Sequence, residues 1–329
     1  MRYGIAFVPQ MEPARVVAIA REAEDLGYDF VYVPDQSFHR DPFALLAACA
    51  QATDTIELGL GLTNPYTRHP VQLARAAGVL GELAEGRFRL GLGAGNRPRL
   101  LHGMGMEQTG LVPRLRESID VIRRLLAGDV VEHHSPTLTL NEVELDFRPA
   151  FPVPVYVGSR GPRVLALAGE VADAVIIEGL FTPPALEWAI EQIDAGAAAG
   201  QRPRPPIAAW QMVATGDADI ASTPLSRRWA ALLISTTRAD TLRTVGVSDE
   251  AIRSVAEEKA RGAGELQGHG LVPEDVMKML MVGPPDTLRR RIEELEAGGV
   301  RDLVALFFGD EDAVRASMGA FARDVARLG

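Results

Sequence analysis

The segment LGLGLTNPYTRHP at residues 58–70 changes character halfway along its length. Its first part alternates leucine with glycine and is apolar throughout, as a buried strand is, and its second part is a polar loop bounded by prolines. A helix-forming run follows at residues 71–77. Gly59 and Gly61 inside a strand indicate a bulge or a close approach of another group to the backbone. A polar loop at the carboxyl end of a buried strand is where α/β proteins bind their ligands.

The same order of a short apolar run followed by an amphipathic helix repeats from one end of the chain to the other. We expect eight strands, at residues 3–8, 29–33, 57–62, 86–93, 154–157, 174–177, 207–214 and 303–307. We expect helices at residues 13–26, 42–52, 71–83, 114–126, 162–167, 184–195 and 285–296. Strands that are apolar along their whole length are buried on both faces, which is typical of parallel strands joined by helices. Eight such units predict a closed α/β fold, the (β/α)8 TIM barrel, and a doubly wound open sheet is the alternative.

Two stretches interrupt this order within what we expect to be a single domain over residues 1–329. Residues 130–147 alternate in polarity like a β-hairpin. Residues 217–281 contain helical pieces and no convincing strand. As an insertion at the carboxyl end of a strand, this second stretch would cover the mouth of the barrel. A helical decoration of the surface, or a dimer contact, is the alternative.

The overall composition is that of a soluble globular protein. Of the 329 residues, 47% are hydrophobic and 24% are charged, and the formal net charge is −10. Because lysine and arginine are mixed with acidic residues and not clustered, we expect no nucleic-acid partner. No apolar run is long enough to cross a bilayer and the amino terminus resembles a strand instead of a secretion signal. We therefore expect a cytoplasmic protein without a membrane partner.

Cysteine and histidine offer little for metal or disulfide chemistry. Cys49 is the single cysteine, so an intrachain disulfide is impossible, and its place in an apolar helix predicts that it fills the core. The pair His133 and His134, like the other histidines, has no cysteine or carboxylate at metal-ligand spacing. We expect no metal site.

Residues 58–70 resemble the third strand and loop of the bacterial luciferase-like superfamily. The likeness is greatest to its coenzyme F420-dependent branch, typified by methylenetetrahydromethanopterin reductase. It extends over nearly the whole chain and is weakest in the insertion at residues 217–281. The resemblance implies a TIM barrel that holds a flavin or deazaflavin at its mouth, and homodimers are usual in this superfamily.

The resemblance assigns cofactor-binding roles to the end of the third strand. In the family, the peptide that matches Gly61–Leu62 lies in a bulge, is a non-prolyl cis bond, and supports the flat ring of the cofactor from behind. Thr63 and Asn64 follow, with short polar side chains suited to hydrogen bonds with ring carbonyls and nitrogens. An ordinary bulge, followed by two residues that simply form a turn, is the alternative.

A second cofactor-binding segment is predicted at Gly158, Ser159, Arg160 and Gly161, where a strand ends just before a helix. Pro162 suits the first turn of that helix, and the unpaired amides and positive dipole of a helix N-terminus attract anions. Arg160 adds positive charge. The segment resembles the family's phosphate-binding loop, which holds the phosphodiester of F420 or the phosphate of FMN.

The candidate catalytic residues depart from the family pattern. F420-dependent relatives commonly carry an Asp-His pair at the end of the second strand, with the histidine over the reactive face. Here Asp35 matches but Gln36 replaces the histidine, and glutamine exchanges no proton near neutral pH. His39 either reaches in from the loop or faces solvent. Glu178, which follows the sixth strand, is the remaining carboxylate for acid–base work if its setting is apolar, and otherwise it is a solvated loop charge.

The run GLGAGNR at residues 91–97 only superficially suggests a dinucleotide-binding motif. Arg99 stands where the third glycine of that motif belongs, and no helix opens directly after it, so we reject a nicotinamide cofactor. In the family this loop runs beside the cofactor, and some members carry a carboxylate where Asn96 stands. We therefore expect Asn96 to be a cofactor-binding residue.

Three functions remain open at this point. The first is a coenzyme F420-dependent oxidoreductase that transfers a hydride between the deazaflavin and a small organic substrate. The second is an FMN-dependent luciferase-like monooxygenase, whose phosphate would use the same loop at residues 158–161. The third is a non-catalytic flavin-binding barrel.

Overall fold

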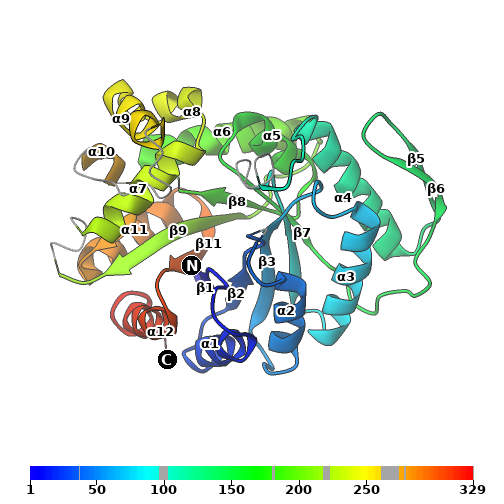
Figure 1. Cartoon of the computed structure of the whole chain (residues 1–329), viewed down its shortest axis with the longest axis horizontal. Helices are drawn as coiled ribbons and strands as arrows, with labels where there is room; N and C mark the ends of the chain where they lie inside the picture. Colours follow the sequence, from blue (N-terminus) through cyan, green and yellow to red (C-terminus); the bar gives the residue numbers. More distant parts are fainter. Residues whose placement is uncertain are drawn as a thin grey trace.

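The computed structural model describes residues 1–36, 38–95, 103–179, 182–217, 223–260, 274–277 and 279–328. Eight parallel strands form its centre: β1 (Arg2–Phe7), β2 (Phe30–Val33), β3 (Glu57–Thr63), β4 (Phe88–Leu92), β7 (Val155–Ser159), β8 (Ala174–Glu178), β9 (Ile207–Thr215) and β11 (Val300–Phe307). They pair in the order β11-β1-β2-β3-β4-β7-β8-β9, and β9 also pairs with β11. Each of the eight strands therefore has two neighbours and the sheet closes (Figure 1). The (β/α)8 TIM barrel is confirmed, and the open sheet is wrong.

Helices surround the barrel and connect its strands (Figure 1). They are α1 (Pro13–Asp25), α2 (Pro42–Ala50), α3 (Pro70–Leu83), α4 (Leu111–Ala127), α5 (Pro162–Val171), α6 (Pro183–Ala199), α11 (Pro285–Ala297) and α12 (Glu311–Ala320), the last continued by a π-helical turn at Phe321–Ala326. Most of them begin at a proline, whose fixed φ suits the first turn and whose missing N–H costs nothing there. Cys49 lies fully buried in α2, and burial raises the pKa of its thiol to about 12, so it is core filler as predicted.

The interior of the barrel is filled by a few large rings that lie against glycines. Phe30, Tyr32, Tyr156 and Trp210 belong to this inner cluster, which is separate from the larger core between strands and helices. Tyr32 stands edge-on to Phe30 and to Trp210, with ring centroids 5.7 and 5.6 Å apart. A methyl group at Gly59 would overlap the Tyr32 ring. Glycine in these strands is therefore required by packing, because the neighbouring ring occupies the space of a side chain.

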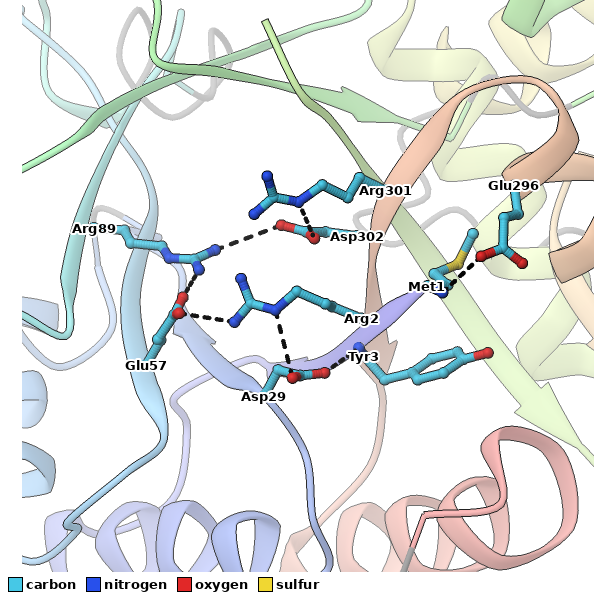
Figure 2. A network of polar contacts seen from close by, with 9 residues as sticks. All are labelled: Met1, Arg2, Tyr3, Asp29, Glu57, Arg89, Glu296, Arg301 and Asp302. Atoms are coloured by element: carbon cyan, nitrogen blue, oxygen red, sulfur yellow. Dashed lines mark hydrogen bonds and ion pairs between the residues drawn. The ribbon is translucent and has the colours of Figure 1, made fainter.

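Charged residues close the amino-terminal end of the barrel (Figure 2). The Arg89 side chain on β4 is almost fully buried, pairs with Glu57 on β3, and lies 3.5 Å from the carboxylate of Asp302 on β11. Arg2 on β1 reaches Glu57 at 2.8 Å and Asp29, just before β2, at 3.4 Å. These side chains link the amino-terminal ends of five neighbouring strands, β11, β1, β2, β3 and β4.

Two excursions leave the barrel on opposite sides of it (Figure 1). The strands β5 (Val131–His134) and β6 (Thr139–Val143) pair antiparallel within the predicted hairpin region. The insertion contains α7 (Pro224–Thr236), α8 (Ala239–Thr244), α9 (Asp249–Ala260) and α10 (Glu274–Met277). It ends at a short strand that the sequence did not reveal, β10 (Met281–Gly283), which pairs with the outer part of β9. Over the described residues, no helix has the length and apolar character that crossing a bilayer requires.

Candidate active site at the barrel mouth

The third strand breaks its register with β4 at the segment singled out in the sequence. Leu60 pairs with Leu90, but the next pair joins Thr63 to Leu92, so β3 holds one residue more than β4. The extra residue lies at Gly61–Leu62, and this peptide bond is cis. A methyl group at Gly61 would lie 2.6 Å from the Trp210 ring and 2.7 Å from the Tyr32 ring. The bulge therefore rests directly on the aromatic layer of the barrel interior.

Leu62 spreads across the mouth towards the neighbouring strands. Its side chain fills the space that a methyl group would need at Gly93 and Gly158. At Gly91 it shares that space with the Leu60 carbonyl, which lies closer. Leu62 itself stays partly exposed. The bulge and three glycines thus place a partly exposed apolar shelf at the carboxyl ends of β3, β4 and β7.

Thr63 and Asp35 lie side by side behind this shelf. The Thr63 hydroxyl donates a hydrogen bond of 2.7 Å to Oδ2 of Asp35, and Nε of Arg68 lies 3.6 Å from the same oxygen. Thr63 is fully buried and the Asp35 side chain is 10% exposed. The sequence analysis expected Thr63 to hydrogen-bond the ring of a cofactor. In this structure its hydroxyl instead bonds within the protein, because a fully buried polar group needs an internal partner.

Asn64 is likewise engaged in holding its own loop. Its Oδ1 accepts hydrogen bonds of 3.0 Å from the backbone N–H groups of Tyr66 and Thr67, and the residue is 2% exposed. This is the turn-forming role of asparagine that the sequence analysis kept as the alternative. Thr63 and Asn64 thus support the shelf from behind.

The predicted phosphate loop has the geometry of an anion site. The Ser159 hydroxyl accepts a hydrogen bond of 2.9 Å from the N–H of Gly161, which is the N-cap of α5. No side chain caps the first turn of α5, and Ser159, Arg160 and Gly161 are all partly exposed. Amides at an uncapped helix N-terminus attract an anion, because the helix dipole adds to their own partial charge.

Glu178 does not have the apolar setting that acid–base work would favour. Its side chain is 48% exposed at the end of β8, and its carboxylate lies 3.4 Å from the guanidinium of Arg160. Solvent and an arginine surround it, so the structure matches the solvated loop charge of the sequence analysis. Glu178 and Arg160 together bridge the ends of β7 and β8.

Of the remaining predicted residues, Gln36 and His39 lie within the described part of the chain. Gln36 and His39 are both partly exposed in the segment after β2. Asn96 and the following residues up to 102 lie outside the described part of the chain. Trp210 faces the barrel interior, whereas Gln211 is fully buried on the same face of β9 as Ala209 and Val213, so only the tryptophan lies on the inner side.

Sequence reasoning missed two features of the mouth. Arg68 pairs with both Asp35 and Asp41 and stacks on the Phe43 ring, 4.4 Å from its centroid. Its place within the polar loop was the available signal.

The other missed feature is the contact between α7 and the rim. Trp229 stacks on Phe308, just past β11, with ring centroids 3.5 Å apart, and a methyl group at Gly179 would lie 2.5 Å from Leu233. Helix α7 therefore packs on the ends of β8 and β11. No local pattern in the sequence indicates these partners.

Over the described residues, no group of three or more His, Cys, Asp or Glu side chains is placed to hold a metal ion.

Comparison with known proteins extends this description. A family model described as luciferase-like monooxygenase matches residues 2–302. The 5,10-methylenetetrahydromethanopterin reductase of Methanolobus tindarius is 34% identical over 309 residues, which cover 93% of this chain and 94% of the relative. The enzyme of the same name from Archaeoglobus fulgidus is 32% identical over 312 residues, 93% of each chain.

A solved structure shows the same architecture. The coenzyme F420-dependent tetrahydromethanopterin reductase from Methanopyrus kandleri has a TM-score of 0.86 and 25% sequence identity with this chain. The similarity covers 99% of this chain and 98% of that one.

Proposed function

The chain belongs to the luciferase-like monooxygenase family, and from that premise we propose that it is a coenzyme F420-dependent oxidoreductase acting on a small organic substrate. The observation that carries the proposal is that Leu62 packs directly on Gly158, where the anion loop begins. One continuous rim therefore offers an apolar shelf for a flat ring beside an anion site for a phosphodiester. The near-full-length relatives that are named as F420-linked or methanopterin reductases favour this cofactor over FMN.

The shelf at the β3 bulge would hold the ring. Leu62 offers a partly exposed apolar surface, and Gly61 behind it rests on Trp210 and Tyr32, so the shelf has little room to move. Such rigid backing fixes the distance between cofactor and substrate, which is a large part of what a protein contributes to cofactor chemistry.

The loop at Ser159–Gly161 would hold the phosphodiester. Arg160 supplies a full positive charge, and the first amides of α5 supply hydrogen-bond donors without a competing side-chain cap. The guanidinium of Arg160 lies 3.4 Å from the carboxylate of Glu178.

The described side chains favour orientation over proton transfer. F420, when bound, supplies or accepts the hydride. Gln36 can donate and accept hydrogen bonds but holds no titratable proton, and the solvated Glu178 is paired with Arg160. Gln36 and Glu178 would therefore position the reactants and would not transfer a proton to them.

A side-by-side calorimetric titration with oxidised F420 and FMN tests the cofactor. We expect one molecule of F420 to bind tightly per chain and FMN to bind far more weakly. Tight FMN binding without F420 binding would instead support the flavin monooxygenase, in which the same anion loop holds the FMN phosphate. The names of the relatives make methylenetetrahydromethanopterin the first substrate to try, with the absorbance of the deazaflavin as the readout. If F420 binds but no acceptor is turned over, the non-catalytic barrel is the better description.

We also propose a cytoplasmic homodimer. The family resemblance supports the dimer, and the buried, free thiol of Cys49 accords with a reducing compartment. Light scattering on the purified chain measures the mass in solution, and a monomer at micromolar concentration would contradict the proposal.

A further inference from the structure

We propose that Asp35 is a positioning residue that acts on the cofactor through Thr63, and that it is not the acid of the reaction. This inference rests on the proposed function. It concerns the pair that lies behind the cofactor shelf, where β2 and β3 end side by side. The family resemblance alone suggests a catalytic role for Asp35, and the contacts of its carboxylate point elsewhere.

The carboxylate of Asp35 already has two partners inside the protein. Oδ2 accepts the Thr63 hydroxyl at 2.7 Å and lies 3.6 Å from Nε of Arg68. The carboxylate of Asp35 is therefore oriented towards donors of the protein itself. With its side chain 10% exposed, Asp35 also offers little surface to a substrate.

Arg68 is itself fixed, so the arrangement is rigid. Its guanidinium pairs with Asp41 and stacks on the Phe43 ring at 4.4 Å. Asp41 is in turn the N-cap of α2, where Oδ1 accepts from the N–H groups of Phe43 and Ala44. The chain of contacts thus runs from Thr63 at the end of β3, through Asp35 and Arg68, to the first turn of α2.

Thr63 connects these contacts to the cofactor shelf at Leu62. It directly follows the Gly61–Leu62 bulge, and its carbonyl oxygen accepts a hydrogen bond of 2.8 Å from the N–H of Gly93. With its hydroxyl bound to Asp35, just past β2, and its carbonyl bound to Gly93, just past β4, Thr63 ties the bulge to the segments on both sides of it. These contacts hold Leu62 in the position where the cofactor ring would lie against it. Without the hydroxyl contact, Thr63 keeps only its backbone hydrogen bond to Gly93 at this end of the bulge.

A double-mutant cycle with F420 affinity as the readout separates positioning from direct action. Thr63→Val removes the hydroxyl while keeping the shape, and Asp35→Ala removes the acceptor. Each should weaken F420 binding roughly 10-fold, the value of one net hydrogen bond. Because both changes break the same contact, the double variant should bind no more weakly than either single variant. Effects that multiply to about 100-fold would overturn the proposal, since Asp35 would then act independently of Thr63.

Conservative and matched variants keep the test decisive if Asp35→Ala unfolds. Asp35→Asn retains an oxygen that accepts the Thr63 hydroxyl, and Thr63→Ser retains the hydroxyl, so both should recover most of the lost affinity. Gly319→Ala, in α12 where an added methyl group meets nothing within 4 Å, is the control and should leave F420 affinity unchanged. If Asp35→Asn binds F420 normally but abolishes turnover while Thr63→Val turns over normally, Asp35 is the acid and the proposal fails.

The wild-type titration keeps the two proposals apart. If the wild-type chain does not bind F420, the proposed function fails whatever the variants do. If it binds and the cycle is additive, only the role of Asp35 is wrong.

Discussion

The two ends of the barrel use the same residue types for opposite purposes. At the amino-terminal floor, Arg89 is buried, pairs with Glu57 and Asp302, and lies over the rings of Phe30 and Tyr156 (Figure 2). At the mouth, the pairs of Asp35 with Arg68 and of Glu178 with Arg160 lie at the edge of a partly exposed shelf. The floor charges pair with one another inside the closed end of the barrel. The mouth keeps an arginine and an uncapped helix N-terminus within reach of one.

This contrast separates stability from binding along the same eight strands. In TIM barrels the carboxyl-terminal face carries the chemistry and the amino-terminal face carries stability. Changes at the floor should therefore lower the free energy of unfolding, and changes at the mouth should lower ligand affinity.

Arg89→Met should have the largest effect on stability. It removes a buried cation and leaves the carboxylate of Asp302, which is 3% exposed, without that partner. Breaking a buried ion pair from one side costs about 3–5 kcal/mol of folding free energy. Urea unfolding followed by circular dichroism measures the loss. A change below 1 kcal/mol would show that the floor is not the stabilising end.

Gly158→Ala should weaken cofactor binding most among the small changes at the mouth. The added methyl group overlaps Cδ1 of Leu62 and would push the shelf out of place. Crowding of this kind costs about 1–3 kcal/mol, which corresponds to a loss of F420 affinity of roughly 5- to 150-fold if it is expressed in binding.

Gly319→Ala is the matched control for that change. A methyl group at Gly319, in α12, meets nothing within 4 Å, and alanine is the better helix former. We expect a stability equal to or up to about 1 kcal/mol above the wild type and unchanged F420 binding. If both glycine variants bind F420 normally, the shelf does not support the ring.

Arg160→Gln should affect only ligands that carry the phosphodiester. A lost charge-assisted hydrogen bond costs about 1.5–3 kcal/mol, so F420 affinity should fall roughly 10- to 150-fold. The deazaflavin core without its phosphodiester tail should bind the variant and the wild type equally. Fluorescence titration measures both ligands, and an equal loss for the two would place the tail elsewhere.

Glu24→Gln should have the smallest effect and should act on stability alone. Partial burial pushes the pKa of Glu24 upwards, but hydrogen bonds from Thr55, Ile56 and Asp54 outweigh this and hold the pKa below its usual value. A carboxyl group whose pKa is lowered by folding stabilises the fold at pH values above its unfolded-state pKa. That stability is lost as the pH falls through the pKa of the folded state.

The variant should therefore lose about 1 kcal/mol at neutral pH and show a shallower loss between pH 5 and 3. Urea unfolding at several pH values tests this. Identical pH profiles for variant and wild type would contradict the assignment.

The sequence predicted the barrel well because the fold depends on repeated local patterns. Each of the eight strands was located, since a parallel strand that is buried on both faces is apolar along its length. The short strand β10 was missed because three residues at an edge carry no such pattern.

The site was predicted less completely because its contacts join distant segments. The resemblance placed Gly61, Leu62 and the loop at Ser159–Gly161 at the mouth, where the structure has them. It gave Thr63 a ligand-facing role, whereas burial and the Asp35 contact turn its hydroxyl inwards. That contact spans 28 positions, and the contact of Trp229 with Phe308 spans still more, so neither leaves a local signal.

A crystal structure of the chain with F420 tests the central claim most directly. The account predicts the deazaflavin ring against Leu62 at the β3 bulge, and the phosphodiester within hydrogen-bond distance of Ser159, Arg160 and the first amides of α5. A ring bound away from β3, or a mouth closed by side chains where the ring belongs, would contradict it.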